Sequence, residues 1–96
     1  MSDIMIICEK YRNAAAALRR SANDLGGARA GLSAAMGFAG DSWQGEASDA
    51  FLDANEWTAK GMERLRISLE DLAAEIDKAA AALEEAELKL RGTIGV

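Results

Sequence analysis

The 96-residue sequence has no histidine, no proline and only one cysteine, Cys8. Without histidine there is no Ser-His or Cys-His pair to activate a nucleophile, and one cysteine forms neither a thiolate zinc site nor an internal disulfide. The sequence also lacks the Asp-x-Asp-x-Asp-Gly loop that binds calcium. These absences predict a protein that binds other molecules rather than an enzyme, with no cofactor and no metal.

Basic residues are scarce as well, with 11 Lys and Arg against 16 Asp and Glu and a net charge of -5. Nucleic acids and anionic membranes attract basic patches, so neither is expected as a partner. The apolar stretch 4–8 is shorter than the about 7 to 15 residues of a signal-peptide core and the about 20 of a membrane span. We therefore expect no membrane span, and a chain that stays in the cytoplasm or leaves it without a cleavable signal.

Alanine dominates the apolar residues, with 21 copies against 5 aromatic residues. Alanine is the best helix former and proline the worst, so this composition favours helices throughout. Each alanine buries little area, however, and burial stabilises by only about 25 cal/mol per Å² of apolar surface. The weak core predicts close contact between the helices and association with a second chain, so an oligomer is expected.

Apolar and small residues recur every seven positions in both halves of the chain, which predicts two long amphipathic helices. No alternation of period two persists, so strands are not expected. The first-half rows are Ile4, Tyr11, Leu18, Leu25, Leu32 and Ile7, Ala14, Ser21, Ala28, Ala35; the second-half rows are Phe51, Thr58, Leu65, Leu72, Ala79, Ala86 and Asn55, Met62, Leu69, Ile76, Leu83, Leu90.

The pattern stops between the halves, where three glycines and several polar residues lie close together. We predict a single all-α domain with helices over about 3–36 and 47–91, a loop over about 37–46 and a flexible tail over 92–96. Asp41 and Ser42 are both candidates to cap the second helix. The short connection predicts an antiparallel helix-turn-helix hairpin.

Ten large residues are expected to pack within and between hairpins. They are Tyr11, Leu18, Leu25, Leu32, Phe51, Trp57, Leu65, Leu69, Leu72 and Ile76. Trp57 lies outside both rows, so it either contacts a second hairpin or shows that the core is wider than two stripes. Cys8 is interpreted as a small packed residue rather than a reactive thiol. Gly27 and Gly31, four residues apart, either admit another helix closely or mark a weak point in the first helix.

The loop contains the motif Trp43-Gln44-Gly45 near the middle of the chain. A glycine at this point can adopt the positive φ that a tight reversal requires. The indole of Trp43 can then fold over the end of the hairpin and bury a large apolar surface.

With this motif, its length and its two helices, and with Ala47 and Phe51 following, the whole chain resembles the Trp-X-Gly (WXG) family of small Esx-type proteins. These early-secreted-antigen-like proteins are substrates of bacterial type VII secretion. The resemblance implies a non-enzymatic protein whose hairpin dimerises into a four-helix bundle. It also implies that Trp43 and Gly45 help form a surface read by the secretion ATPase.

The family typically carries a second signal, Tyr-x-x-x-Asp/Glu, near the end of the second helix. This chain departs from it, because Leu83 stands where the tyrosine would be and Glu87 supplies the carboxylate. The alternative is that Leu83 is a packing residue and Glu87 a solvated one. The departure puts independent export in doubt: the chain either travels with a partner that carries the complete signal or presents a degenerate signal of its own.

Three functions therefore stay open. The first is a secreted homodimer or a subunit paired with another WXG protein, cytoplasmic before export and extracellular afterwards. The second is an adaptor that binds the helical targeting domain of a larger type VII toxin. The third is an unrelated structural coiled-coil module, and an enzyme is the least expected.

Overall fold

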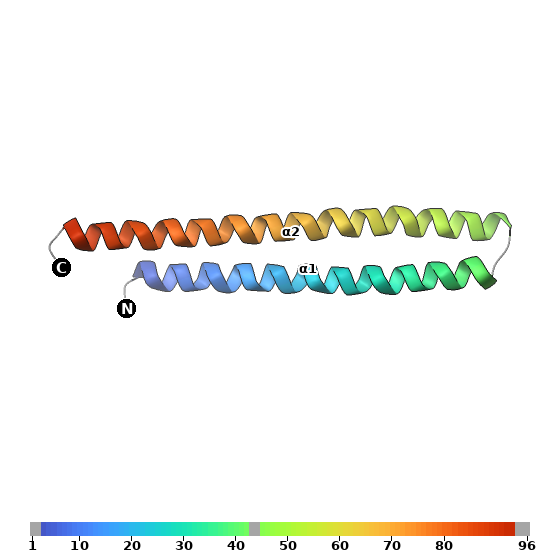
Figure 1. Ribbon diagram of the computed structural model, residues 1–96, viewed down its shortest axis with the longest axis horizontal. Helices are drawn as coiled ribbons and strands as arrows, with labels where there is room; N and C mark the ends of the chain where they lie inside the picture. Colours follow the sequence, from blue (N-terminus) through green and yellow to red (C-terminus); the bar gives the residue numbers. More distant parts are fainter. Residues whose placement is uncertain (1–2, 43–44, 94–96) are drawn as a thin grey trace. The chain divides into compact units, whose positions relative to one another are not determined.

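The computed structural model describes residues 3–42 and 45–93, and nearly all of them are helical. Helix α1 spans Asp3–Ser42 and helix α2 spans Glu46–Thr93, with no strand in these two ranges (Figure 1). The all-α fold predicted from composition and spacing is confirmed. Because no proline interrupts either helix, both run for many turns without a break.

Both helices extend beyond their predicted limits. Helix α1 passes through Gly37 and Gly40 and ends at Ser42, six residues later than expected. Asp41 and Ser42 thus belong to α1 and do not cap α2, which begins at Glu46 and continues to 93. Each glycine in a helix costs about 1 kcal/mol relative to alanine. The cost of Gly37 and Gly40 is therefore too small to end a helix of this length. Of the predicted tail, only 94–96 follow α2, and these lie outside the described residues.

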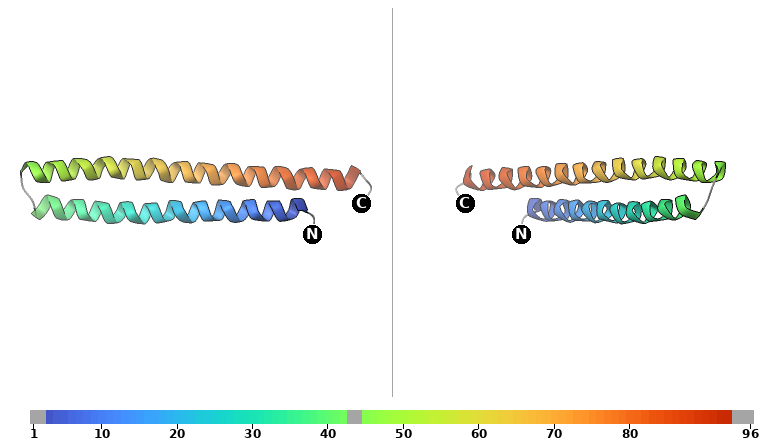
Figure 2. Two further views of the ribbon diagram at one scale, coloured as in Figure 1. Left: turned by 180° about the vertical axis from the view of Figure 1, so that it is seen from behind. Right: turned by 45° about the vertical axis from the view of Figure 1, so that its right-hand side comes forward.

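The chain divides into two compact units, each built from a segment of both helices. The terminal unit joins residues up to 20 with those from 69 onward, and the loop unit comprises residues 21–68. Within each unit the α1 and α2 segments lie side by side, as both views of Figure 2 show. In the terminal unit, ion pairs join Arg12 to Glu84 and Arg19 to Asp77. From Arg12 to Arg19 the chain advances by seven residues, whereas from Glu84 to Asp77 it goes back by seven. This opposite order confirms the antiparallel hairpin.

Small residues form the tightest contact between the helices of the terminal unit. Cys8 and Ala15 of α1 and Ala73 and Ala80 of α2 are all buried, at intervals of seven residues in each helix. The Sγ atom of Cys8 lies 3.4 Å from the carbonyl oxygen of Ala80. The interpretation of Cys8 as a packed residue is confirmed.

The loop unit continues the same pattern with fewer buried positions. Its buried residues are Ala22 of α1 and Ser48 and Ala59 of α2. Larger residues beside them are only half-buried. These are Leu25, Leu32, Met36, Phe51, Leu52 and Met62.

The predicted rows need a correction in register. In α1 the row through Ile7 and Ala14 is exposed, and the buried row is one residue later, through Cys8 and Ala15. In α2 the row through Leu65 is likewise largely exposed from Thr58 onward. Two alanine-rich helices approach most closely where side chains are smallest, so the small residues form the seam and the large ones border it.

Candidate functional site

The connection between the helices is described only at Gly45, because Trp43 and Gln44 lie outside the described residues. Gly45 has a φ of 90°, which confirms the positive φ expected from the sequence. Its carbonyl oxygen accepts a hydrogen bond from the backbone N–H of Asp49 at 3.1 Å, which closes the first turn of α2. Glu46 and Asp49 place negative charge at this helix N-terminus, where the helix dipole favours it. The predicted role of Trp43 stays a prediction.

Charged side chains line one side of the terminal unit. The Nη2 atom of Arg12 lies 2.7 Å from Glu84 Oε1, and that of Arg19 lies 2.6 Å from Asp77 Oδ2. The Arg12 Nε–H donates a further hydrogen bond to Glu84. This hydrogen bond, and then the charge of Glu84, raise the pKa of Arg12. The two ion pairs link α1 to α2 along the same side of the buried alanine seam.

The other side of the terminal unit is apolar and open. At about 100° per residue, Tyr11 and Leu18 border Ala15 on one side of α1, while Arg12 and Arg19 border it on the other. Because the ion pairs join the charged sides of α1 and α2, the apolar sides of the two helices also lie next to each other. This apolar strip of the terminal unit comprises Ile7, Tyr11, Leu18, Leu69, Leu72 and Ile76. Leu72 is half exposed, at 50%.

The loop unit has an equivalent apolar strip. Leu65, which is 50% exposed, lies on the same side of α2 as Phe51, whereas Glu63 lies on the other side. The strip of the loop unit comprises Leu25, Leu32, Phe51, Met62 and Leu65. Each unit therefore has one apolar side that its own two helices do not cover.

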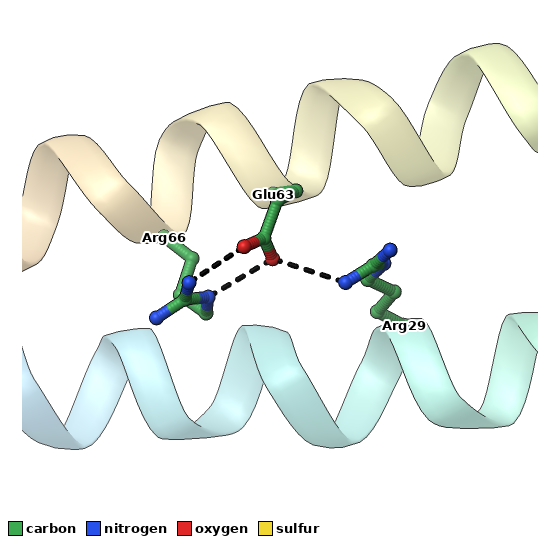
Figure 3. Close-up of polar contacts among 3 residues, drawn as sticks. All are labelled: Arg29, Glu63 and Arg66. Carbon is green, nitrogen blue, oxygen red and sulfur yellow. Dashed lines mark hydrogen bonds and ion pairs between the residues drawn. The ribbon is translucent and has the colours of Figure 1, made fainter.

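The charged side of the loop unit holds a three-residue ionic cluster (Figure 3). Arg66 donates two hydrogen bonds to Glu63, at 2.6 and 2.9 Å, and Arg29 reaches the same carboxylate from α1 at 3.2 Å. The hydrogen bond from Arg66 is the largest cause of the lowered pKa of Glu63, and the charge of Arg29 acts in the same direction. This cluster was not predicted from the sequence. The seven-residue spacing could have predicted it. Arg29 follows Ala22 by seven residues and Arg66 precedes Ala73 by seven, so an arginine stands in each row of buried alanines.

Trp57 is the most exposed large apolar residue for which an exposed fraction is known, at 77%. It lies two residues from both Asn55 and Ala59, which belong to the interhelix seam. Two residues correspond to about 200° of rotation, so Trp57 faces away from α1. The sequence left open whether Trp57 is exposed or is buried in a wider core, and in the structure it is exposed.

The profile of the family described as "Proteins of 100 residues with WXG" (WXG100) matches residues 3–88, which include all of α1, the connection and most of α2. The chain belongs to the WXG100 family. No curated protein and no solved structure matches it. WXG100 proteins are small, non-enzymatic helical proteins associated with type VII secretion, which exports them without a signal peptide.

Leu83 and Glu87, near the end of α2, stand at the positions of the second signal that WXG proteins typically carry. Leu83 is half-buried in the row of Leu69 and Ile76, as a packing residue would be. Glu87 is buried, not solvated, because it follows Ala80 by seven residues and so falls in the alanine row. Its Oε1 accepts a hydrogen bond from Arg91 Nη2 at 3.1 Å. The seven-residue spacing from Ala73 through Ala80 would have predicted this burial.

Three further observations concern the described part of this WXG100 chain. No described helix is long and apolar enough to cross a membrane. Within residues 3–42 and 45–93 no group of three or more Asp, Glu or Cys side chains is placed to hold a metal ion. A Cβ atom added at Gly27 or Gly31 would meet no atom of α2 within 4 Å, so these glycines do not serve a close approach within the described chain.

Proposed function

We propose that this protein is a non-enzymatic substrate or component of a type VII secretion system that works as a dimer of helical hairpins. In this proposal two copies pair through their apolar strips into a four-helix bundle. The protein is cytoplasmic before export and extracellular afterwards. The observation that supports the proposal most directly is the uncovered apolar strip on each unit, opposite the ion pairs.

The energetics of burial favour such pairing. The seam within the hairpin consists of alanine and cysteine, which bury little apolar area. Leu65 and Leu72 would each lose contact with water if a second hairpin covered the strip. Burying a leucine side chain fully is worth about 1.5–3 kcal/mol, more than an alanine contact supplies. Covering the strip would therefore add apolar burial that the alanine seam does not provide.

Recognition by the secretion ATPase is assigned to two places. The first is the connection with Trp43 and Gly45, and the second is the end of α2 with Leu83 and Glu87. Trp57 and Phe38 are exposed aromatic residues outside the WXG motif. Phe38 therefore offers a matched control for a loss of export on mutation of Trp43.

Export tests this role. A tagged chain is expressed in a bacterium with an active type VII system, and the secreted fraction is measured with and without the secretion ATPase. The expected result is ATPase-dependent export that Trp43→Ala abolishes and Phe38→Ala preserves at equal intracellular levels. Export of Trp43→Ala at the wild-type level would refute the assigned role of the motif.

A second candidate function, an adaptor for a larger toxin, is favoured by Leu83 in place of the signal tyrosine. The test is co-expression with the helical targeting domain of a large protein encoded beside this chain. A stable complex that replaces the self-dimer supports the adaptor, and persistence of the self-dimer in the mixture supports the homodimeric substrate.

A further inference from the structure

An outer face of the loop unit combines an exposed aromatic ring with carboxylates. This outer face comprises Asp49, Asp53 and Trp57 of α2. They follow one another at intervals of four residues, which places them within about 80° of each other around the helix. All three residues are exposed, and Trp57 is 77% exposed. Its neighbours on either side along this face, Ala54 and Gly61, are small, so the indole is accessible to a partner.

The two carboxylates of the outer face are reachable and hold no cation. Most other acidic side chains of α2 are paired with a basic one, as Glu56 is with Lys60 at 3.3 Å. No ion pair joins Asp49 or Asp53 to another described residue. The helix dipole favours Asp49 in the first turn of α2, but its effect falls off before Asp53. Like charges one turn apart repel each other, so the helix itself does not account for the carboxylate of Asp53.

The charge around the outer face selects the kind of partner. Residues 30–59 include five acidic residues and no basic one, so they carry a charge of -5, equal to the net charge of the entire chain. The remaining residues therefore sum to zero. Such a concentration of charge attracts cations and repels anions, at distances up to about 8 Å in physiological salt. A partner on this face is expected to be basic.

We propose that the outer face binds a basic helix of a partner protein, with an arginine over the indole of Trp57. The guanidinium stacks on the ring, and its N–H groups donate hydrogen bonds to the carboxylate of Asp53 one turn away. Four helical residues rise by about 6 Å, so a second basic residue one turn along the partner helix reaches Asp49. Arginine suits the site better than lysine, because its planar group both stacks on an aromatic ring and bonds a carboxylate.

The outer face is separate from the proposed dimer contact. Trp57 points away from α1, and Asp53 lies on the same side of the seam as Glu63. Leu65 and the rest of the apolar strip of the loop unit lie on the other side. A second hairpin on the strip leaves the outer face open. The inference therefore does not rest on the proposed dimer, and a monomeric chain would present the same face.

Two alanine-based peptides of about 16 residues, long enough to form a helix, serve as probes. One carries arginines four positions apart along one face, and the other has glutamine in place of each arginine. The full-length chain is titrated with each peptide, and the indole N–H signal of Trp57, assigned by its loss in Trp57→Phe, is followed by NMR. The arginine peptide is expected to give saturable shifts, and the glutamine peptide to bind at least about tenfold more weakly.

Four variants make the test specific. Trp57→Ala removes the ring, and we expect about fivefold weaker binding of the arginine peptide. Asp53→Asn keeps the shape of the side chain but removes its charge, and we expect a similar loss. Phe38→Ala removes an exposed aromatic residue of α1, and Asp71→Asn removes an exposed carboxylate of α2 in the terminal unit. These two controls are expected to bind the arginine peptide like the wild type.

The proposal is overturned if the glutamine peptide binds as tightly as the arginine peptide, if Trp57→Ala or Asp53→Asn keeps the wild-type affinity, or if either control loses as much. It is also overturned if Trp57→Ala lowers the molar mass in solution, because a second copy of the chain would then occupy this face. A helical circular-dichroism spectrum shows that each variant is folded, as expected for changes at exposed residues. Failure of the dimer or export experiments would leave the peptide titrations unchanged.

Discussion

Gly45 is the one described residue with a positive φ, at 90°, and it stands directly before α2. An L side chain in the left-handed region costs about 1–2 kcal/mol, so Gly45→Ala is expected to lower the free energy of unfolding by about that amount. Gly37→Ala, at an open helical position, is expected to raise it by up to about 1 kcal/mol. Urea denaturation measures both values. An unchanged or increased stability of Gly45→Ala would contradict this role of the glycine.

Glu63 gives the loop unit a pH dependence. Folding lowers its pKa from the ordinary value of 4.5, mainly through the hydrogen bond from Arg66. The ionised carboxylate therefore stabilises the folded chain above the unfolded pKa, and this contribution is lost as the pH falls through the lower folded pKa. Glu63→Gln is expected to lower the melting temperature at about pH 7 and to differ little from wild type at about pH 2.

The control for Glu63 is Glu75→Gln, which breaks an exposed pair with Lys78 inside α2. Exposed pairs of this kind contribute little, so this variant is expected to melt close to the wild type. Thermal melts of both variants across the acidic range measure the difference. A gap between Glu63→Gln and wild type that stays constant down to about pH 2 would rule out the ionised carboxylate as its cause.

At the scale of the helices, the alanine seam sets how closely α1 and α2 approach. Ala73 is fully buried in this seam, whereas Ala74 is exposed on the next position of the same helix. Ala73→Leu is expected to destabilise the chain by about 1–3 kcal/mol, because the extra atoms force the helices apart. Ala74→Leu keeps the composition and is expected to change stability little. Equal stabilities of the two variants would argue against a close-packed seam at this level.

The sequence predicted the helices well but placed their contact one residue away. Alanine content and the absence of proline are sufficient for two long helices, because both act through local propensity. Spacing alone does not show whether the position three or four residues after a large side chain is the buried one, since both positions lie near that side chain on a helix. The large residues suggested the row of Leu65 and Leu72, whereas the closest approach follows the small row of Ala73 and Ala80.

The candidate site was less predictable than the helices. The positive φ of Gly45 followed from the motif, because a reversal requires a residue without a Cβ atom. The burial of Glu87 was missed although Glu87 continues the seven-residue spacing of Ala73 and Ala80, because a carboxylate is ordinarily assumed to be solvated. That its buried Oε2 has no hydrogen-bond partner in the described structure depends on how α1 and α2 pack at this level, which no local sequence pattern specifies.

At the scale of the whole molecule, the proposed pairing through the apolar strips predicts the oligomeric state. The chain has a mass of 10.2 kDa, and a homodimer is expected to give about twice that value in solution at micromolar concentration. Leu65→Glu places a charge within the strip and is expected to shift the mass to that of the monomer. Ile67→Glu is the matched control, because it alters an exposed residue two positions later on nearly the opposite side of α2.

Light scattering coupled to size exclusion measures these masses. A wild-type chain of monomer mass would exclude the homodimer and point to a missing WXG100 or toxin partner. Dissociation by Ile67→Glu but not by Leu65→Glu would place the contact on the other side of the hairpin and overturn the assignment of the strips.

The single thiol of the chain lies inside the seam, with only 1% of Cys8 exposed, against the backbone of α2 at Ala80. A thiol-specific reagent reaches it only after the two helices separate at that level. The rate of Cys8 labelling therefore times the opening of the hairpin without any engineered probe. A maleimide present during export would leave Cys8 unlabelled if the hairpin passes through the channel closed, and would label it if the helices part on the way.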